Sequence, residues 1–240
     1  HSGLTASRVV TTNGSKQLTS SNDITSFIAA ATDAAAGIVE LATSTEVAAG
    51  SDAGRVVTPA GLAALHQYQA VYVPAAGMTP TTTNGAAAGT YEYATQDINM
   101  DYLAFDGATE EYAEFQFPMP ENWDRGTIKA KFFWTSATGS TAGDTVEWEL
   151  AGGALSDDDA IDAALGTSQV ISDTLLADNG ADLQVSSATP AITIGGTPVL
   201  GDLIHFKVSR NVGGTDDMAE DAWLLGVWIQ YKVTNTVSAW

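Results

Sequence analysis

Two clusters of carboxylates contain residue types that could do chemistry. They comprise Asp157, Asp158, Asp159 and Asp162, then Asp216, Asp217, Glu220 and Asp221. A Ca²⁺ ion takes about six to eight oxygen ligands, but neither cluster has the Asp-x-Asp-x-Asp-Gly spacing of a calcium loop. Helix capping explains the first cluster more simply and a solvated loop explains the second. We therefore expect no metal or cofactor, with Ca²⁺ as an unsupported alternative.

Carboxylates could also cleave sugars. Glycoside hydrolases use two carboxyl groups, one as an acid and the other as a nucleophile or base. With 29 Asp and Glu residues in the chain, some pair falls at the right separation by chance. A nucleophilic triad would need His66 or His205, and neither accompanies a Gly-x-Ser-x-Gly motif. We expect no catalytic residues and no enzyme, and glycan depolymerisation remains a weaker alternative.

Tryptophans are better candidates for a binding site. The turn around Trp123 places an aromatic ring beside two charged residues, where it either stacks on a sugar or plugs the end of the domain. Trp228 falls on the polar side of its strand pattern, which indicates a contact between subunits or, less favoured, a platform for a sugar. The candidate receptor-binding residues are Trp123, Asp124, Arg125, Asp216, Asp217 and Trp228.

The elements that must position these residues are strands. Alternation with period two predicts strands over 127–135, 145–151, 203–210 and 222–233, with weaker ones near 71–73, 98–105, 111–117, 168–175, 182–187 and 191–194. The pattern places Trp134, Trp148 and Trp223 on inward faces. If the first two strands pair, their lysines lie across from glutamates. The number of strands predicts an antiparallel β-sandwich of jelly-roll type.

Three helices are expected from their capping residues. One covers 22–36, one begins near Thr58 with Pro59 in its first position, and one covers 155–166 with Ser156 as its cap. Between the first two, the sequence GIVELAT (37–43) indicates a short strand or extended segment.

Charge divides the chain. Residues 1–66 have a net charge of −2, and residues 67–240 have 24 acids, six bases and a net charge of −18. Such a domain repels phosphate backbones, so we expect no nucleic-acid partner. No apolar run approaches the ~20 residues of a membrane span, so we expect no membrane insertion. Residues 1–66 carry too little bulk for a core of their own, unless identical chains share one.

Residues 37–65, GIVELATSTEVAAGSDAGRVVTPAGLAAL, resemble the phage tail-fibre repeat through Gly37, Ile38, Val39, Leu41, Ala42, Val57, Thr58, Pro59 and Leu62. The upstream segment 3–21 is similar to another phage-fibre element. Three further segments, 78–87, 110–135 and 155–162, resemble a fibre or head-spike domain of marine and alphaproteobacterial phages and gene transfer agents. The family implies a homotrimeric virion protein that binds the cell surface.

The resulting expectation is a mainly β chain with a partly helical shaft (1–66), a linker and first strand (67–90) and a receptor-binding sandwich (91–240). Its function would be host attachment through a surface glycan or envelope protein, with other virion proteins bound at the N-terminus. The alternative is a structural head-fibre, neck or fibre-base subunit. Net charge predicts neutral or amino sugars, or a basic protein. We expect the contact surface in the loops: the Trp123 turn, 136–143, 176–181 and 211–221.

We predict a trimer, because three thin N-terminal segments can enclose a core that one cannot. Sedimentation of the full chain should show three copies, and removal of residues 1–66 should weaken the assembly. A stable full-length monomer at micromolar concentration would contradict the shaft interpretation.

Overall fold

The computed structural model describes residues 11–12, 18–19, 39–63, 65, 68–177 and 182–234. The chain divides into two compact units, His1–Leu65 and His66–Trp240. The predicted helix at 22–36 lies outside the described residues. No helix in the described part is long and apolar enough to span a membrane.

The first unit holds short elements: β1 (Thr11–Thr12), β2 (Leu18–Thr19), β3 (Glu40–Leu41), α1 (Ser44–Ala49), β4 (Arg55–Val56) and α2 (Pro59–Ala63). A capping box between Thr43 and Glu46 starts α1. The hydroxyl of Thr58 accepts a hydrogen bond from the amide of Gly61, so the helix predicted to begin there is confirmed. Arg55 joins these elements, since its guanidinium pairs with carboxylates of β3, α1 and the loop between α1 and β4.

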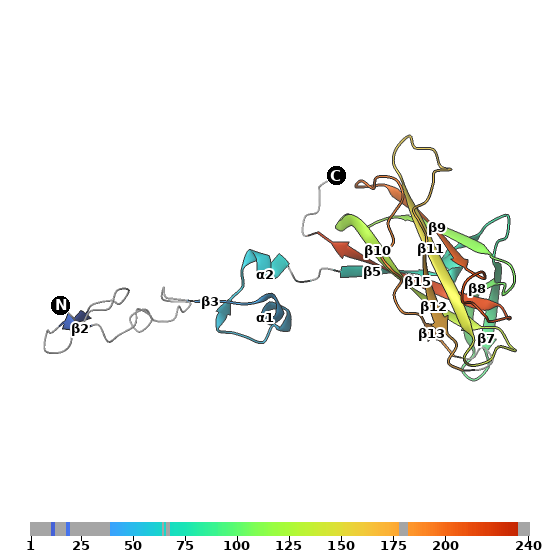
Figure 1. Ribbon diagram of the computed structural model, residues 1–240, viewed down its shortest axis with the longest axis horizontal. Helices are drawn as coiled ribbons and strands as arrows, with labels where there is room; N and C mark the ends of the chain where they lie inside the picture. Colours follow the sequence, from blue (N-terminus) through green and yellow to red (C-terminus); the bar gives the residue numbers. More distant parts are fainter. Residues whose placement is uncertain are drawn as a thin grey trace. The chain divides into compact units, whose positions relative to one another are not determined.

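The second unit is a sandwich of two antiparallel sheets, which confirms the prediction of a mainly β chain (Figure 1). The six-stranded sheet contains β5 (Tyr68–Pro74), β7 (Ala87–Tyr93), β8 (Ile98–Phe105), β10 (Trp123–Ser136), β13 (Gln184–Val185) and β15 (Ala222–Val233). The five-stranded sheet contains β6 (Thr79–Pro80), β9 (Tyr112–Pro118), β11 (Thr145–Leu155), β12 (Gln169–Thr174) and β14 (Leu203–Arg210). Residues 67–90, expected as a linker and a first strand, therefore hold β5, β6 and the start of β7.

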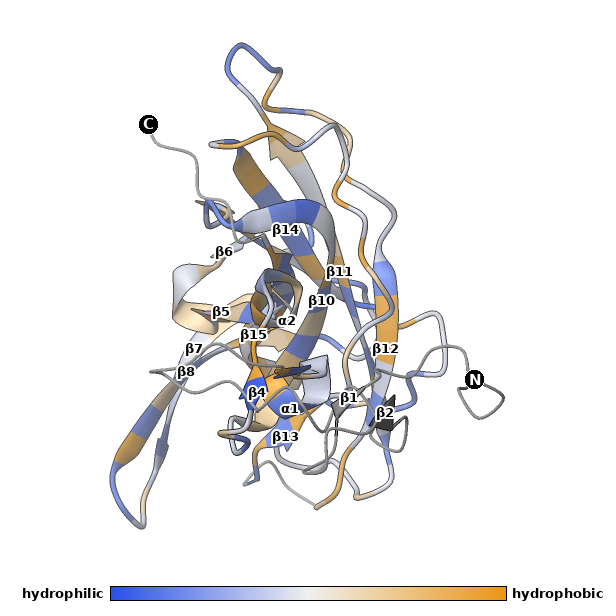
Figure 2. Cartoon of the chain, turned by 90° about the vertical axis from the view of Figure 1, so that its left-hand side faces the viewer, coloured by the Kyte–Doolittle hydropathy of each residue, from blue (hydrophilic) through white to orange (hydrophobic). Residues whose placement is uncertain are grey.

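Strand order places β10 and β15 at the centre of the six-stranded sheet. The order is β13-β10-β15-β8-β7. The edge of β15 that does not pair with β10 is shared by two strands: β8 pairs with residues 222–224 and β5 with residues 226–232. From β9 to β15 the chain crosses between the sheets at nearly every step, as in a jelly roll. Figure 2 shows hydrophobic and hydrophilic bands alternating along the strands, as expected where one face of each sheet is buried.

The pairing of 127–135 with 145–151, on which the lysine–glutamate contacts were conditional, does not occur. The two strands belong to different sheets, because β10 pairs with β13 and β15 whereas β11 pairs with β12 and β14. Their inward faces meet instead: the rings of Trp134 and Trp148 have centroids 6.2 Å apart and both side chains are fully buried. The lysines of β10 therefore face the neighbouring residues of β15 and not glutamates.

The predicted inward position of Trp223 is also wrong, because β15 contains an irregularity. Trp134 lies opposite Leu224 and Phe133 lies opposite Gly226, so Leu225 is an extra residue that has no partner on β10. Such a bulge reverses the inward and outward alternation before it. As a result Trp223 lies on the outer face, where its ring stacks on Tyr102 at 4.2 Å.

The predicted helix at 155–166 does not form. Asp159 instead closes a turn, since its carboxylate accepts a hydrogen bond from the Ser156 amide, and Asp158 has a left-handed φ of 67°. Further along, the amide of Gly166 donates to the carbonyl of Gly152 on β11. The tertiary hydrogen bond outweighs the local helix signal, which is only a weak preference.

We expect Trp134→Ala or Trp148→Ala to lower the free energy of unfolding by roughly 3–5 kcal/mol, because each removes a fully buried ring. Urea unfolding followed by circular dichroism measures the change. Trp228→Ala, which removes a half-exposed ring, is the matched control. A loss below about 1 kcal/mol for both buried positions would contradict the assignment of these faces to the core.

Candidate functional site

The outer side of the six-stranded sheet carries those side chains of its two central strands, β10 and β15, that point away from the core. Along β10 the buried residues Ile128, Ala130, Phe132 and Trp134 alternate with outward ones. After the bulge, β15 alternates in the same way. We call the outward side of β5, β10 and β15 the Trp228 face, and it comprises Tyr68, Tyr72, Lys129, Lys131, Phe133, Trp228, Gln230 and Lys232.

The register of the strands fixes the arrangement of the Trp228 face. Lys131 lies opposite Trp228, which lies opposite Tyr72. One step along the sheet, Lys129 lies opposite Gln230. Directly opposed residues of antiparallel strands have Cβ atoms about 4.5–5.5 Å apart, so these groups form one continuous patch.

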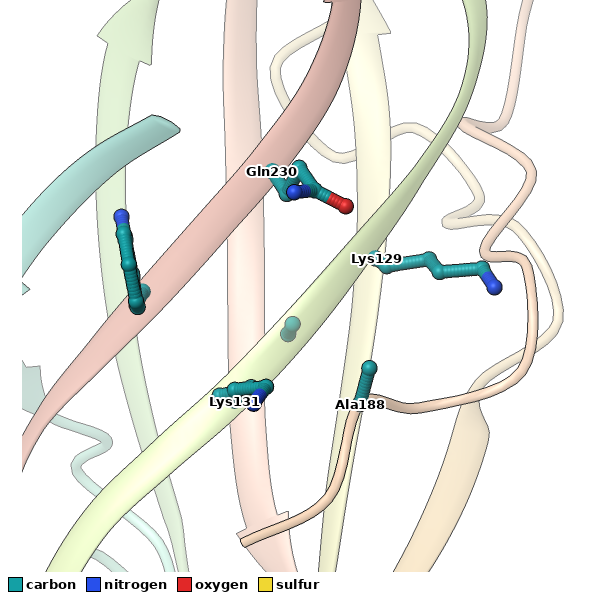
Figure 3. Close-up of a pocket in the computed structure, with 6 residues that line it drawn as sticks. Lys129, Lys131, Ala188 and Gln230 are labelled. Atoms are coloured by element: carbon teal, nitrogen blue, oxygen red, sulfur yellow. The ribbon is translucent and has the colours of Figure 1, made fainter. Parts of the chain in front are cut away.

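Two adjoining hollows lie on this face. The first, of about 210 Å³, is lined by Lys129, Ala130, Lys131, Ala188, Trp228 and Gln230. The second, of about 180 Å³, shares Lys129 and Gln230 and is also lined by Tyr68, Asp124, Thr127, Ile128 and Lys232. Figure 3 shows Lys129 extending from β10 toward the segment that carries Ala188, and Gln230 lying between the two strands.

Aromatic contacts hold Trp228 in place at one edge. Its ring lies 6.2 Å from Phe133, which packs edge to face on Tyr72 at 5.4 Å. The Tyr72 side chain can extend across β15 because residue 226 is a glycine. A Cβ at that position would lie 2.3 Å from the hydroxyl oxygen of Tyr72. That hydroxyl donates to the carbonyl of Leu225, and burial raises the pKa of Tyr72, so it remains a donor at neutral pH. Trp228 is still 45% exposed.

The structure separates the residues predicted from the sequence. Asp124 and Trp228 belong to the two adjoining hollows. Asp216 and Asp217 instead fasten the 211–221 loop to β11 of the five-stranded sheet, where they accept hydrogen bonds from the amides of Glu147 and Thr145. These two aspartates and Trp228 therefore lie on different sheets.

Trp123 is not a platform for a ligand. Its side chain is only 3% exposed, and its indole nitrogen is buried with no hydrogen-bond partner among the described residues. This position agrees with the alternative in which Trp123 plugs the end of the sandwich. Arg125 follows in a left-handed conformation, with φ of 61°, at the irregularity between Trp123 and Ile128, and its side chain is exposed.

Asp216 has a structural role. Its carboxylate pairs with the guanidinium of Arg210 at 2.7 Å, and both side chains are almost completely buried. The same guanidinium donates to the carbonyls of Phe105, Glu220 and Met218. A charge pair buried to this extent supports the fold when its remaining donors are also satisfied, and it is not accessible to a ligand.

A metal site is not formed by either acidic cluster: within the residues that the structure describes, no group of three or more His, Asp or Glu is arranged to hold an ion. The carboxylate of Asp217 already accepts a hydrogen bond from the Thr145 amide. Asp202 accepts hydrogen bonds from the Ser156 hydroxyl and the Val199 amide.

The polar residues beside Trp228 were not predicted from the sequence. Lys129 and Lys131 alternate with apolar residues as expected, but their partners on the neighbouring strand are Gln230 and Trp228 and not glutamates. The signal that could have found them is the shared polar side of two strands, where Trp228, Gln230 and Lys232 follow the same alternation. Pairing of β10 with β15 brings these two polar sides together.

Comparison with protein-family models and with curated proteins gives no match. Among solved structures, the CBM22-1 and GH10 modules of Clostridium thermocellum endo-1,4-β-D-xylanase 10B with xylohexaose match at a TM-score of 0.40 and 15% identity, over 70% of this chain and 28% of that one. The carbohydrate-binding module CBM28, specific for non-crystalline cellulose, matches at 0.35 and 10%, over 67% and 87%. A family 11 carbohydrate-binding module of Clostridium thermocellum with a β-1,3-1,4-mixed-linked tetrasaccharide matches at 0.31 and 11%, over 72% and 91%. These similarities are too distant to assign a function.

Glu147 provides a pH test of the 211–221 loop. Burial alone raises its pKa, but hydrogen bonds from Thr215, Ser172 and Asn211 outweigh burial and hold the pKa below the ordinary 4.5. A lowered folded-state pKa adds stability above the unfolded-state pKa, and this stability is lost as the pH falls through the folded value. We therefore expect the stability advantage of the wild type over Glu147→Gln to shrink between pH 7 and pH values well below 4.5.

Urea midpoints of both proteins across this range measure the effect. Glu149→Gln, two residues further along β11, is the matched control. A wild-type advantage that stays constant with pH would contradict the role given to the Glu147 carboxylate.

Proposed function

We propose that the sandwich binds a carbohydrate on the Trp228 face, and that the chain is a trimeric fibre or spike protein by which a phage particle attaches to its host. The observation that carries the binding site is a half-exposed tryptophan on an outer sheet face, in a hollow that Lys129, Lys131 and Gln230 also line. The motifs in residues 37–65 support the virion role.

Sugar recognition needs two kinds of group. A pyranose ring presents a flat patch of C–H groups and a rim of hydroxyls, so it suits an aromatic platform with hydrogen-bonding groups around it. Trp228 offers the platform. Gln230 offers a donor and an acceptor, and Lys129 and Lys131 offer three donors each. All four line the same hollow.

The shape of the face favours an extended ligand over a small compact one. Small-molecule sites are usually single clefts of about 300–1,000 Å³ that cover most of the ligand, whereas the two hollows here are smaller, adjoin each other and share Lys129 and Gln230. A chain of several sugar units could occupy both hollows at once. A surface polysaccharide has this form.

Binding without cleavage is part of the proposal. Glycoside hydrolases need two carboxyl groups on either side of the bond that breaks. Among the residues that the structure describes, those that line the first hollow include no carboxylate, and those that line the second include only Asp124. Asp124 also accepts a hydrogen bond from the Gly126 amide. The face therefore offers contacts to a sugar but no acid–base pair.

Exposed apolar residues in the first unit support the trimer. Five large apolar side chains between residues 39 and 62 are 40–61% exposed in the single chain: Val39, Leu41, Val56, Val57 and Leu62. Packing against identical chains would remove this surface from water, and each buried CH₂ contributes about 0.8 kcal/mol. The same segment carries the resemblance to phage fibre repeats.

We expect Trp228→Ala to weaken binding to the polysaccharide ligand by about tenfold or more, because the stacking platform is lost. Stability should change little, since the ring is already half exposed. Affinity electrophoresis in gels containing bacterial surface polysaccharides, followed by calorimetry with those that retard the wild type, measures the effect.

Tyr91→Ala is the matched control, because Tyr91 is 43% exposed on the same sheet but belongs to β7. Equal loss in both variants, or loss in the control alone, would move the site to the β7–β8 end. If Trp228→Ala dissociates the oligomer and leaves binding intact, then Trp228 is a subunit contact and the proposed site is wrong.

A further inference from the structure

Positive charge is concentrated on one face of an otherwise acidic domain. Residues 67–240 hold six basic side chains, and three of them, Lys129, Lys131 and Lys232, line the two hollows of the Trp228 face. Arg210 is buried in its pair with Asp216, and Lys207 lies over the ring of Tyr112 on the other sheet. Half of the basic residues in this unit therefore belong to the candidate ligand site.

We propose that the ligand of the Trp228 face is an anionic polysaccharide, whose carboxylate or sulfate groups contact Lys129, Lys131 and Lys232 while a sugar ring stacks on Trp228. The inference rests on the proposed function, since it specifies the class of glycan bound at that site. It replaces the expectation of a neutral or amino sugar, which followed from net charge alone.

The geometry provides more than one position for an anion. Lys129 and Lys131 project from the same side of β10 two residues apart, a spacing of about 6.4–6.8 Å. Lys232 follows Gln230 on β15, and Gln230 lies directly opposite Lys129. Two lysines thus line each hollow, Lys129 and Lys131 the first and Lys129 and Lys232 the second, so a polymer lying across both meets a cation at successive points along its length.

These lysines are available for a ligand. Within residues 68–177 and 182–234, the ion pairs are His205 with Glu114 and Arg210 with Asp216, and neither involves the three lysines. Of the lining residues in the described part of the chain, none in the first hollow is a carboxylate, whereas the second hollow has Asp124. The first hollow is consequently the more positive of the two, and it is the one that contains Trp228.

The acidic remainder of the domain does not prevent this binding. Charges in solvent are screened over about 8 Å at physiological ionic strength, so an anion in the first hollow responds mainly to the lysines that line it. The other carboxylates act as a longer-range repulsion that disfavours anions elsewhere on the surface. The distribution therefore directs an anionic chain to one face.

The test uses the full-length protein and polymers that differ only in charge. Polygalacturonate, polymannuronate and polyglucuronate are each compared with their carboxyl-reduced neutral forms and with sulfated derivatives of those neutral forms. We expect at least one charged polymer to bind more tightly than its neutral counterpart, and the carboxylate and sulfate arms identify the preferred anion. Lys129→Gln/Lys131→Gln should weaken that binding by roughly tenfold.

Two control variants make the result specific. Lys207→Gln removes the same type of charge from the other sheet and should leave binding unchanged. Lys129→Arg/Lys131→Arg keeps both charges and should retain most of the affinity. Circular dichroism melting curves establish that all variants are folded.

The outcomes separate this inference from the proposed function. Binding to neutral polymers that equals or exceeds binding to their charged forms, with sensitivity to Trp228→Ala, would overturn the anionic ligand and leave the carbohydrate site in place. Charged-polymer binding that survives Lys129→Gln/Lys131→Gln would also overturn it. If no polymer in the set binds and Trp228→Ala has no effect on any surface polysaccharide, both proposals fail.

Discussion

The contact between Trp134 and Trp148 across the two sheets is the constraint on which the candidate site depends. Both rings are fully buried, so β10 must turn that side inward along its length. Since strand side chains alternate with period two, burial of Ile128, Ala130 and Phe132 leaves the lysines between them no position except the outer face. The core therefore determines which side chains of β10 face outward.

The alternation also explains how much of the fold could be predicted. The bounds of β8, β14 and β15 agree with the sequence pattern, and along β14 the buried Ile204, Phe206 and Val208 alternate as expected. The helix over 155–166 was wrong because its capping signal is local, whereas the Gly166 amide bonds to β11. Trp223 was placed on the wrong side because a single extra residue, Leu225, shifts the register, and nothing in the local pattern marks that bulge.

The candidate site was harder to predict than the strands that carry it. Trp228 and Asp124 could be chosen from residue type and local position. The polar partner of Trp228 is harder to choose, because Lys131 belongs to another strand and precedes Trp228 by 97 residues in the sequence. Choosing that partner requires knowledge of which strands pair. Asp216 illustrates the converse problem, because its acidic neighbours made it resemble a solvated loop residue. Its carboxylate is in fact buried against Arg210, six residues earlier at the end of β14, and accepts a hydrogen bond from the Glu147 amide of β11, a partner that only the fold brings near.

The position of β5 has a mechanical consequence. β5 is the first strand after the boundary between the two units, and it pairs with β15 from Tyr68 to Pro74 beside Trp228. Hydrogen bonds between antiparallel strands run perpendicular to the strands, so a pull on the chain along β5 loads the whole ladder in shear instead of opening it one bond at a time. Tension transmitted along the chain into β5 would thus be borne by β5 and β15, two of the strands that present the Trp228 face.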